Sequence, residues 1–154
     1  MITYRKARSE DILPAITLWC RIWDEFVIVQ ASATEHDYDE IARNSGLLKK
    51  YENGERIMLV AADDEKIVGV IGAEIGACSI KPPLCVDRRY QRQGIAAELL
   101  YRMVCVLKIA GCSSVRVDSS EYALPFYAKA GFVQVGTKQQ HEGFVSVPME
   151  YVVK

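Results

Sequence analysis

The pattern of apolar and polar residues predicts a strand and two helices in the first third of the chain. Residues 2–8 alternate as a strand does, and apolar side chains recur at helical spacing from Ile12 to Phe26. A second helix is expected from about Asp37. The Asn53-Gly54 pair then breaks the chain, because this dipeptide favours a turn.

The middle of the chain reads as three strands. Residues 57–62 form a continuous apolar run, residues 63–65 are polar, and residues 67–75 are again apolar. Two such runs joined by a short polar turn predict a β-hairpin. Residues 79–86 supply a further strand, which Pro82-Pro83 perturbs.

The longest helix is expected next, with an apolar stripe from Ile95 to Ala110 and Gly111 at its C-terminal end. The remaining elements are a short strand around residues 115–117, a helix at 121–130, and strands at 132–136 and 144–153. This order predicts a mixed α/β fold around one sheet. Neither a repeat nor a linker interrupts it, so we expect one domain over residues 1–154.

Composition and charge exclude several classes of protein. The chain has 154 residues and a formal net charge of −1, so no overall charge attracts it to nucleic acid or to an anionic membrane. No apolar run approaches the length of a membrane span, and the N-terminus lacks the apolar segment of a signal peptide. We therefore expect a cytoplasmic protein.

The cysteines and histidines do not form a metal-binding pattern. There are five cysteines and two histidines, and no C-x-x-C pair occurs. A zinc site is therefore not expected, nor is any other metal. Most of the cysteines lie in apolar runs, where thiols act as small hydrophobic groups, and this fits a reducing compartment. The cysteines are Cys20, Cys78, Cys85, Cys105 and Cys112.

The segment from Val86 to Ala96 joins a predicted strand to the start of the longest helix. A helix N-terminus carries partial positive charge and unpaired N–H groups, which together make an anion site. Gly94 lets a ligand approach the backbone, and Arg88, Arg89 and Arg92 add cations. The segment lacks the Gly-Lys-Ser/Thr ending of a P-loop and the glycines of a dinucleotide fingerprint. The alternative interpretation is a charged loop in which Gly94 is an ordinary loop glycine.

Two motifs carry a resemblance to a known family. The pattern Gln91-x-x-Gly94-x-Ala96 resembles the coenzyme A signature of the GNAT superfamily of N-acyltransferases. The run from Ala123 to Phe132 also resembles that superfamily, and it follows at the expected distance. The resemblance implies a central mixed, mostly antiparallel sheet with a splayed pair of strands, flanked by helices.

The resemblance also implies an activity, the transfer of an acetyl group from acetyl-CoA to a primary amine by direct attack in a ternary complex. The backbone of Leu84–Val86 would pair with the pantetheine arm, and the N–H groups of Gln91–Ala96 would bind the pyrophosphate. Ser120 stands where many relatives have an asparagine, and its hydroxyl is shorter. The implied cofactor-binding residues are Leu84, Cys85, Val86, Gln91, Arg92, Gln93, Gly94, Ile95, Ala96, Ser120 and Phe126.

Catalysis of this kind needs a proton donor for the leaving thiolate and a base for the amine. Tyr127 matches the family's acid, and the alternative is a packing aromatic. Glu74 is the candidate base because the family often uses a strand glutamate; it can equally be an exposed carboxylate. Asp118, Glu121 and His141 remain further candidates.

Two other features have a functional and a structural interpretation. Cys85 could carry the acyl group, but a cysteine in an apolar strand is usually inert because burial raises the thiol pKa. Residues 22–42 hold acidic residues without Lys or Arg, which could form a lid that attracts a cationic amine or could be a solvated helix face.

Two alternatives to an enzyme stay open at this point, a non-catalytic acyl-CoA sensor and an interaction module with the same fold. The acceptor could be a small-molecule amine or a protein amine. The apolar stretch at residues 26–29 leaves a homodimer open as well.

Overall fold

The computed structural model describes residues 1–27, 35–141 and 144–153, and the side chains of residues 1–22, 38–140 and 145–153. Its strands are β1 (Ile2–Lys6), β2 (Ile57–Asp63), β3 (Lys66–Glu74), β4 (Ser79–Val86), β5 (Ser114–Ser120), β6 (Val133–Gln134), β7 (Gln139–His141) and β8 (Phe144–Val152). Its helices are α1 (Ser9–Val27), α2 (Glu35–Asn44), α3 (Leu47–Glu52), the 3₁₀ turn η1 (Arg88–Tyr90), α4 (Ile95–Ile109) and α5 (Leu124–Lys129).

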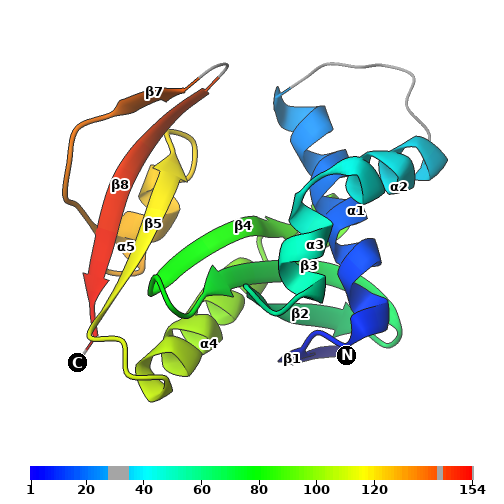
Figure 1. Cartoon of the computed structure of the whole chain (residues 1–154), viewed down its shortest axis with the longest axis horizontal. Coiled ribbons are helices and arrows are strands. Elements are labelled where there is room, and N and C mark those ends of the chain that lie inside the picture. The colour runs from blue at the N-terminus through cyan, green and yellow to red at the C-terminus, as the bar shows by residue number, and fades with distance from the viewer. Residues whose placement is uncertain (28–34, 142–143, 154) are drawn as a thin grey trace.

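These strands form one sheet in the order β1-β2-β3-β4-β5-β8-β6, and β7 pairs with β8. Every pairing is antiparallel except that of β4 with β5, so the predicted mixed, mostly antiparallel sheet is confirmed. The parallel pair meets only where Ser79 lies opposite Arg116, and the two strands then diverge (Figure 1). The predicted splayed strand pair is therefore β4 and β5.

Helices cover both faces of the sheet (Figure 1). On one face α4 buries Leu99, Met103 and Leu107 against β3 and β5. On the other face α1, α2 and α3 bury a second apolar cluster against β2 and β3. Its fully or largely buried members are Ala15, Ile16, Cys20, Tyr38, Ala42, Tyr51, Met58, Val60 and Val70.

Gly69 on β3 fixes how closely α4 approaches the sheet. A Cβ at this position would lie 3.1 Å from Ile95 Cγ2 and 3.2 Å from Leu99 Cδ1. Glycine leaves this space to Ile95 and Leu99 in the first two turns of α4, and both side chains are fully or almost fully buried. The start of α4 is consequently held tightly beside the end of β4.

Three elements differ from the sequence-based expectation. The helix expected from Asp37 begins at Glu35 and is split into α2 and α3 at Ser45-Gly46. The Ser45 hydroxyl donates to the Ala42 carbonyl at 2.7 Å, and such a local bond competes with helix continuation. The strand expected at 132–136 shortens to β6, and β7 was not predicted because its sequence is polar and lacks alternation.

Cys78 and Cys112 form a disulfide across 34 residues of chain. The interpretation of the cysteines as small hydrophobic thiols is therefore wrong for this pair. No spacing motif marks the two cysteines, and only the fold brings them together. Cys20, Cys85 and Cys105 are free.

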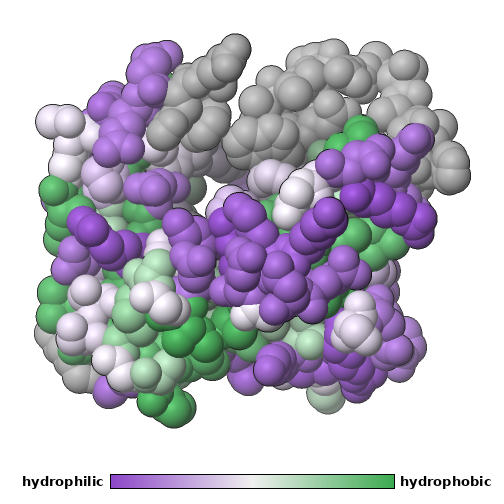
Figure 2. Space-filling view, viewed as in Figure 1, coloured by the Kyte–Doolittle hydropathy of each residue, from purple (hydrophilic) through white to green (hydrophobic). Residues whose placement is uncertain are grey.

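Hydrophilic side chains run across the middle of the face shown in Figure 2, and hydrophobic ones gather at its lower left, where α4 ends in Figure 1. None of the described helices is long and apolar enough to cross a bilayer. Within the described ranges, no group of three or more His, Cys, Asp or Glu could hold a metal ion.

Candidate functional site

The turn after β4 is anchored from several directions by Asp87. Its N–H donates to the Val68 carbonyl at 2.7 Å, and its carboxylate accepts from the Arg89 N–H at 3.0 Å. The carboxylate also faces Arg21 Nη2 at 3.4 Å and Lys66 Nζ at 3.9 Å. Asp87 is buried, so these bonds fix the turn to β3 and α1.

The turn continues into a concave backbone segment at the start of α4. Arg92 and Gly94 have φ values of 64° and 80°, in the left-handed region that favours glycine. A Cβ on Gly94 would meet no atom within 4 Å, so the space in front of the glycine is open. Glycine is favoured here because of its backbone conformation and not because of crowding. Left-handed residues curl successive N–H groups inward, and the first turn of a helix adds unpaired N–H groups.

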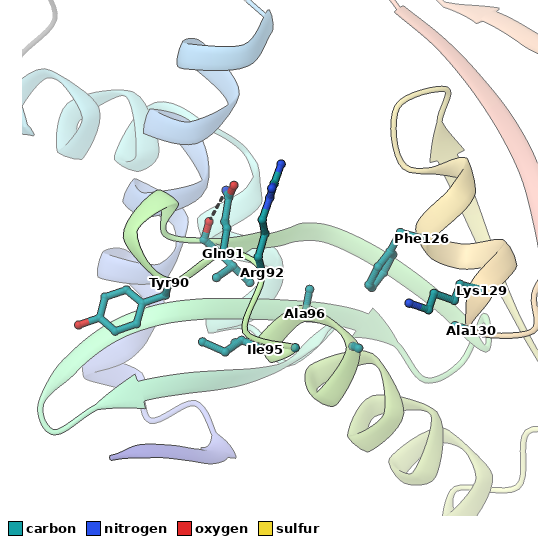
Figure 3. A pocket seen from close by; sticks show the side chains of 11 residues that line it. Tyr90, Gln91, Arg92, Ile95, Ala96, Phe126, Lys129 and Ala130 are labelled. Atoms are coloured by element: carbon teal, nitrogen blue, oxygen red, sulfur yellow. Dashed lines mark hydrogen bonds between the residues drawn. The ribbon is translucent and has the colours of Figure 1, made fainter.

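Gln91 holds this segment against the end of β4. Its side-chain Nε2 donates to the Val86 carbonyl at 3.0 Å (Figure 3). The segment is thus tied at both ends, by Asp87 before it and by α4 after it. We call this backbone segment, residues 91–96, the cradle. Because it is fixed in this way, it needs little reorganisation to receive an anion.

A cavity of about 440 Å³ lies between this cradle and α5. That volume is within the usual range for small-molecule sites. On the side of the cavity opposite the cradle, Phe126 and Lys129 extend from α5 toward α4 (Figure 3). The lining residues are Val86, Tyr90, Gln91, Arg92, Gly94, Ile95, Ala96, Ala97, Phe126, Lys129 and Ala130.

The cavity lining is cationic. Arg92 comes from the cradle and Lys129 from α5, while no carboxylate is among the described lining residues. The partial positive charge at the start of α4 adds to these two charges. The arrangement favours an anionic ligand whose uncharged part can lie against Phe126 and Ile95.

A family model described as an acetyltransferase (GNAT) domain matches residues 28–153. The chain belongs to the GNAT family of acetyltransferases. The cradle and cavity described above are therefore parts of a GNAT domain. The resemblance to this family that the two sequence motifs indicated is confirmed.

Solved GNAT structures share the fold of this chain. The PaiA N-acetyltransferase of Thermoplasma acidophilum, solved in complex with coenzyme A, is 20% identical with a TM-score of 0.73, covering 99% of each chain. A GNAT acetyltransferase of Staphylococcus aureus Mu50 is 17% identical with a TM-score of 0.73, covering 100% of each chain. The ribosomal-protein-S18-alanine N-acetyltransferase of Escherichia coli is 16% identical with a TM-score of 0.67, covering 99% of this chain and 94% of that one.

The GNAT structure brings most of the expected cofactor residues to one cavity. Those that line it are Val86, Gln91, Arg92, Gly94, Ile95, Ala96 and Phe126, whereas Leu84, Cys85, Gln93 and Ser120 do not. Sequence reasoning missed Tyr90, Ala97, Lys129 and Ala130 as lining residues. Lys129 could have been found, because it lies three residues after Phe126 and so shares a face of the same helix.

Tyr127 is buried in the core next to the cavity. It is 4% exposed, and its ring contacts Phe126 and Phe132 edge-on, with centroid distances of 5.1 and 5.4 Å. Among the described residues its hydroxyl has no hydrogen-bond partner. Burial raises the pKa of Tyr127, so the phenol keeps its proton at neutral pH. The ring does not line the cavity, although the adjacent Phe126 does.

The candidate bases whose side chains are described, Glu74, Asp118 and Glu121, are not among the residues that line the cavity. Glu74 is half-buried at the end of β3, opposite Ser79 and therefore beside the closed end of the splay. Glu121 pairs with Lys138 Nζ at 2.9 Å, and Asp118 is exposed on β5. The side chain of His141 is outside the described ones.

The surroundings of Ser120 and Cys85 favour a structural role for each residue. The Ser120 hydroxyl accepts from the Ala123 N–H at 3.2 Å, so it supports the turn into α5. Burial raises the pKa of the Cys85 thiol, which disfavours the thiolate that nucleophilic attack requires.

The acidic segment is described only in part. Asp39 accepts from the Thr17 hydroxyl at 2.9 Å and so links α2 to α1, while Glu40 is exposed. The side chains of Asp24, Glu25, Glu35 and Asp37 lie outside the described residues, as do those of residues 26–29. The proposed acidic lid therefore stays a hypothesis.

Proposed function

We propose that this chain is an N-acetyltransferase that moves an acetyl group from acetyl-CoA to a primary amine. One observation carries the proposal, the anchored backbone cradle around Gly94 that opens into a cationic cavity. Membership of the GNAT family supports acyl transfer, and a relative of the same fold was solved with coenzyme A.

The residues present fit a molecule that has a diphosphate at one end of a long uncharged arm. The N–H groups between Gln91 and Ala96 would bind the diphosphate, with Arg92 and Lys129 as counter-charges. Beyond Ser79, the edge of β4 that faces β5 has no strand partner among the described residues. The arm would pair with this edge at Leu84–Val86 as an added strand does.

The chemistry follows from a thioester placed in the opening between β4 and β5. A neutral amine attacks the carbonyl carbon, the C–N bond forms, the C–S bond breaks, and the sulfur leaves with the electron pair. Tyr127 keeps its proton and would donate it as a hydrogen bond to the developing thiolate. Glu74 would accept the amine proton through water at the closed end of the opening.

Two measurements test this proposal together. Titration calorimetry with CoA measures binding, and a thiol-release assay with acetyl-CoA measures turnover on a panel of small amines and a protein substrate rich in lysine. We expect saturable CoA binding and thiol release that depends on an amine. Binding without release on any amine would instead indicate an acyl-CoA sensor. A lack of CoA binding at millimolar concentration would contradict the proposal.

A further inference from the structure

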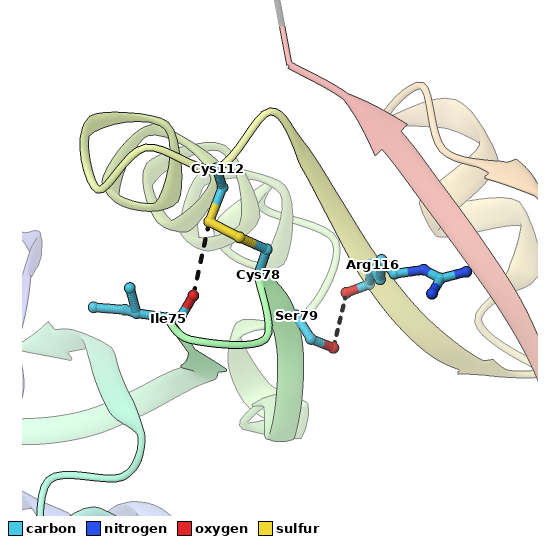
Figure 4. The surroundings of a disulfide bond; sticks show 5 residues. All are labelled: Ile75, Cys78, Ser79, Cys112 and Arg116. Carbon is cyan, nitrogen blue, oxygen red and sulfur yellow. Dashed lines mark hydrogen bonds between the residues drawn. A yellow bond between two sulfur atoms is a disulfide. The ribbon is translucent and has the colours of Figure 1, made fainter.

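A disulfide lies at the point where the two splayed strands meet (Figure 4). Cys78 ends the turn after β3, and Cys112 lies just before β5; their Cα atoms are 5.8 Å apart. Beside the disulfide, the Arg116 N–H donates to the Cys78 carbonyl at 2.9 Å. The Ser79 hydroxyl donates to the Arg116 carbonyl at 3.2 Å. The covalent bond therefore reinforces the apex from which β4 and β5 diverge.

The position of the apex allows a small rotation there to change the width of the cavity. From Ser79 to Val86, β4 extends roughly 20 Å, since a strand rises about 3.3 Å per residue. A rotation of about 5° at the apex would therefore move the far end of the strand by about 2 Å. Val86 lines the cavity at that far end, and Phe126 lines it from α5, which packs against β5. Contacts that span the cavity are sensitive to a displacement of this size.

We propose that the Cys78–Cys112 disulfide is a positioning element for the cofactor cavity, and that its reduction weakens the binding of acyl-CoA. This inference rests on the proposed function, because it assigns a redox dependence to the same site. In a reducing compartment such a bond is typically redox-sensing rather than permanent. The redox state of one pair of cysteines would then set the acyltransferase activity.

Exposure indicates which cysteine a reductant would reach first. Cys78 is partly exposed on its turn, whereas Cys112 is 7% exposed, so Cys78 is the more accessible of the two. The thiolate of a dithiol attacks Cys78 Sγ, the S–S bond breaks, and Cys112 leaves with the electron pair and takes a proton. The second thiol of the reagent then displaces Cys78, which also takes a proton, and the reagent becomes a cyclic disulfide.

The first test compares CoA affinity in the two redox states. Calorimetry measures the Kd for CoA with the oxidised protein, the protein reduced by dithiothreitol, and the double variant Cys78→Ser/Cys112→Ser. Alkylation after unfolding, read by mass spectrometry, confirms the state of the bond. We expect the reduced protein and the double variant to bind at least about fivefold more weakly than the oxidised protein, which is the low end of ordinary coupling between two sites. Cys105→Ser is the matched control, because it removes a free cysteine of α4, and it should bind as the wild type does.

The second test uses a readout that stabilisation alone would not move. Linkage requires CoA to shift the equilibrium between disulfide and dithiol by the same factor by which reduction weakens CoA binding. A titration in mixtures of oxidised and reduced dithiothreitol, with and without saturating CoA, measures this shift. We expect CoA to favour the disulfide.

The outcomes separate this inference from the function on which it rests. Reduction should also lower the unfolding midpoint, by about 5–15 °C, because any disulfide restricts the unfolded chain. If the midpoint falls but CoA binds equally well in both states, the disulfide only stabilises the fold and the inference is wrong. If CoA binds in neither state, the proposed function is wrong and the inference falls with it.

Discussion

The two sides of the cavity are built from different parts of the protein. On the β4–α4 side the groups that would contact a ligand are backbone N–H groups, whose positions are fixed by the left-handed residues Arg92 and Gly94 and by buried Asp87. On the α5 side they are the side chains of Phe126 and Lys129, with Tyr127 buried next to the cavity. The first side is suited to holding a ligand, whereas the second adds the counter-charge of Lys129 and the candidate proton donor Tyr127. Substitutions on the first side should therefore change Kd, and on the second side Tyr127 should change kcat while Lys129 changes Kd more weakly.

The largest effect is expected on the α5 side, from Tyr127→Phe. Removing a proton donor from an acyl transfer should lower kcat by about 10²–10⁴-fold, while the Kd for CoA stays within about twofold. The unfolding midpoint should hardly change, because the lost hydroxyl has no partner among the described residues. Steady-state kinetics, calorimetry and thermal unfolding measure these three quantities. Tyr101→Phe is the control, since Tyr101 is 66% exposed on α4.

The pH dependence of the folding stability tests whether the Tyr127 hydroxyl keeps its proton. Burial raises its pKa above the ordinary value of 10.0, so the phenol stays protonated throughout the neutral and mildly alkaline range. Its contribution to stability is therefore present below about pH 10 and is lost as the pH rises through the raised pKa. Urea unfolding at pH 8 and pH 11 should show a smaller alkaline loss of stability in Tyr127→Phe than in the wild type. An equal loss in both proteins would show that Tyr127 ionises no later in the folded state.

The next largest effect is expected on the β4–α4 side, from Gly94→Val. A β-branched residue at a φ of 80° is strained, and its Cβ would enter the open space in front of the cradle. The Kd for CoA should rise about 100-fold, which corresponds to ~2.7 kcal/mol. Gly54→Val is a matched control, because Gly54 has a φ of 83° and no neighbour within 4 Å of its added Cβ. It should cost similar stability and leave the Kd unchanged.

The difference between the two sides also explains what the sequence could predict. The cradle is local, since the end of an apolar strand, a glycine and the start of an amphipathic helix follow one another in a single segment, 86–96. Its position between β4 and α4 was predicted correctly from that order, and its role in binding the diphosphate stays a prediction. The opposite wall depends on where α5 packs relative to α4, and no local pattern states this. Ala130 was therefore missed as a lining residue, and Lys129 could be found only through its spacing of three residues from Phe126 on the same helix.

The same reasoning applies to the fold. Strongly periodic elements such as β2, β3 and α4 were predicted well, because their apolar faces are fixed by the core they bury. The split between α2 and α3 falls at Ser45, whose hydroxyl bonds the Ala42 carbonyl, and β7 forms by pairing with β8. The disulfide joins cysteines that become neighbours only after the sheet forms. These features are tertiary in origin, and a pattern of hydrophobic positions does not contain them.

A smaller effect is expected from the counter-charge on α5. Lys129→Ala should weaken CoA binding about fivefold at low salt, since an exposed charge contributes at most about 1 kcal/mol. The difference from wild type should shrink as salt is added, because exposed charges are screened. Lys49→Ala removes an equally exposed lysine from α3 and should leave the Kd unchanged at every salt concentration. A loss for Lys129→Ala that does not depend on salt would mean that its charge is not what binds CoA.

The smallest effect is expected from Cys85→Ala, and it tests the division of roles most directly. Cys85 lies on β4, the side assigned to binding, and it is the cysteine nearest in sequence to the cradle. Because burial raises the pKa of its thiol, little thiolate exists at neutral pH, and we expect direct attack by the amine without a covalent intermediate. Both kcat and Kd should stay within about threefold of wild type, because the change removes one small, half-buried group that touches no reacting atom. Mass spectrometry of protein incubated with acetyl-CoA alone should show no acetyl adduct on Cys85. A stable adduct that disappears when an amine is added would move the chemistry to the β4 side and reverse the assignment of the two walls.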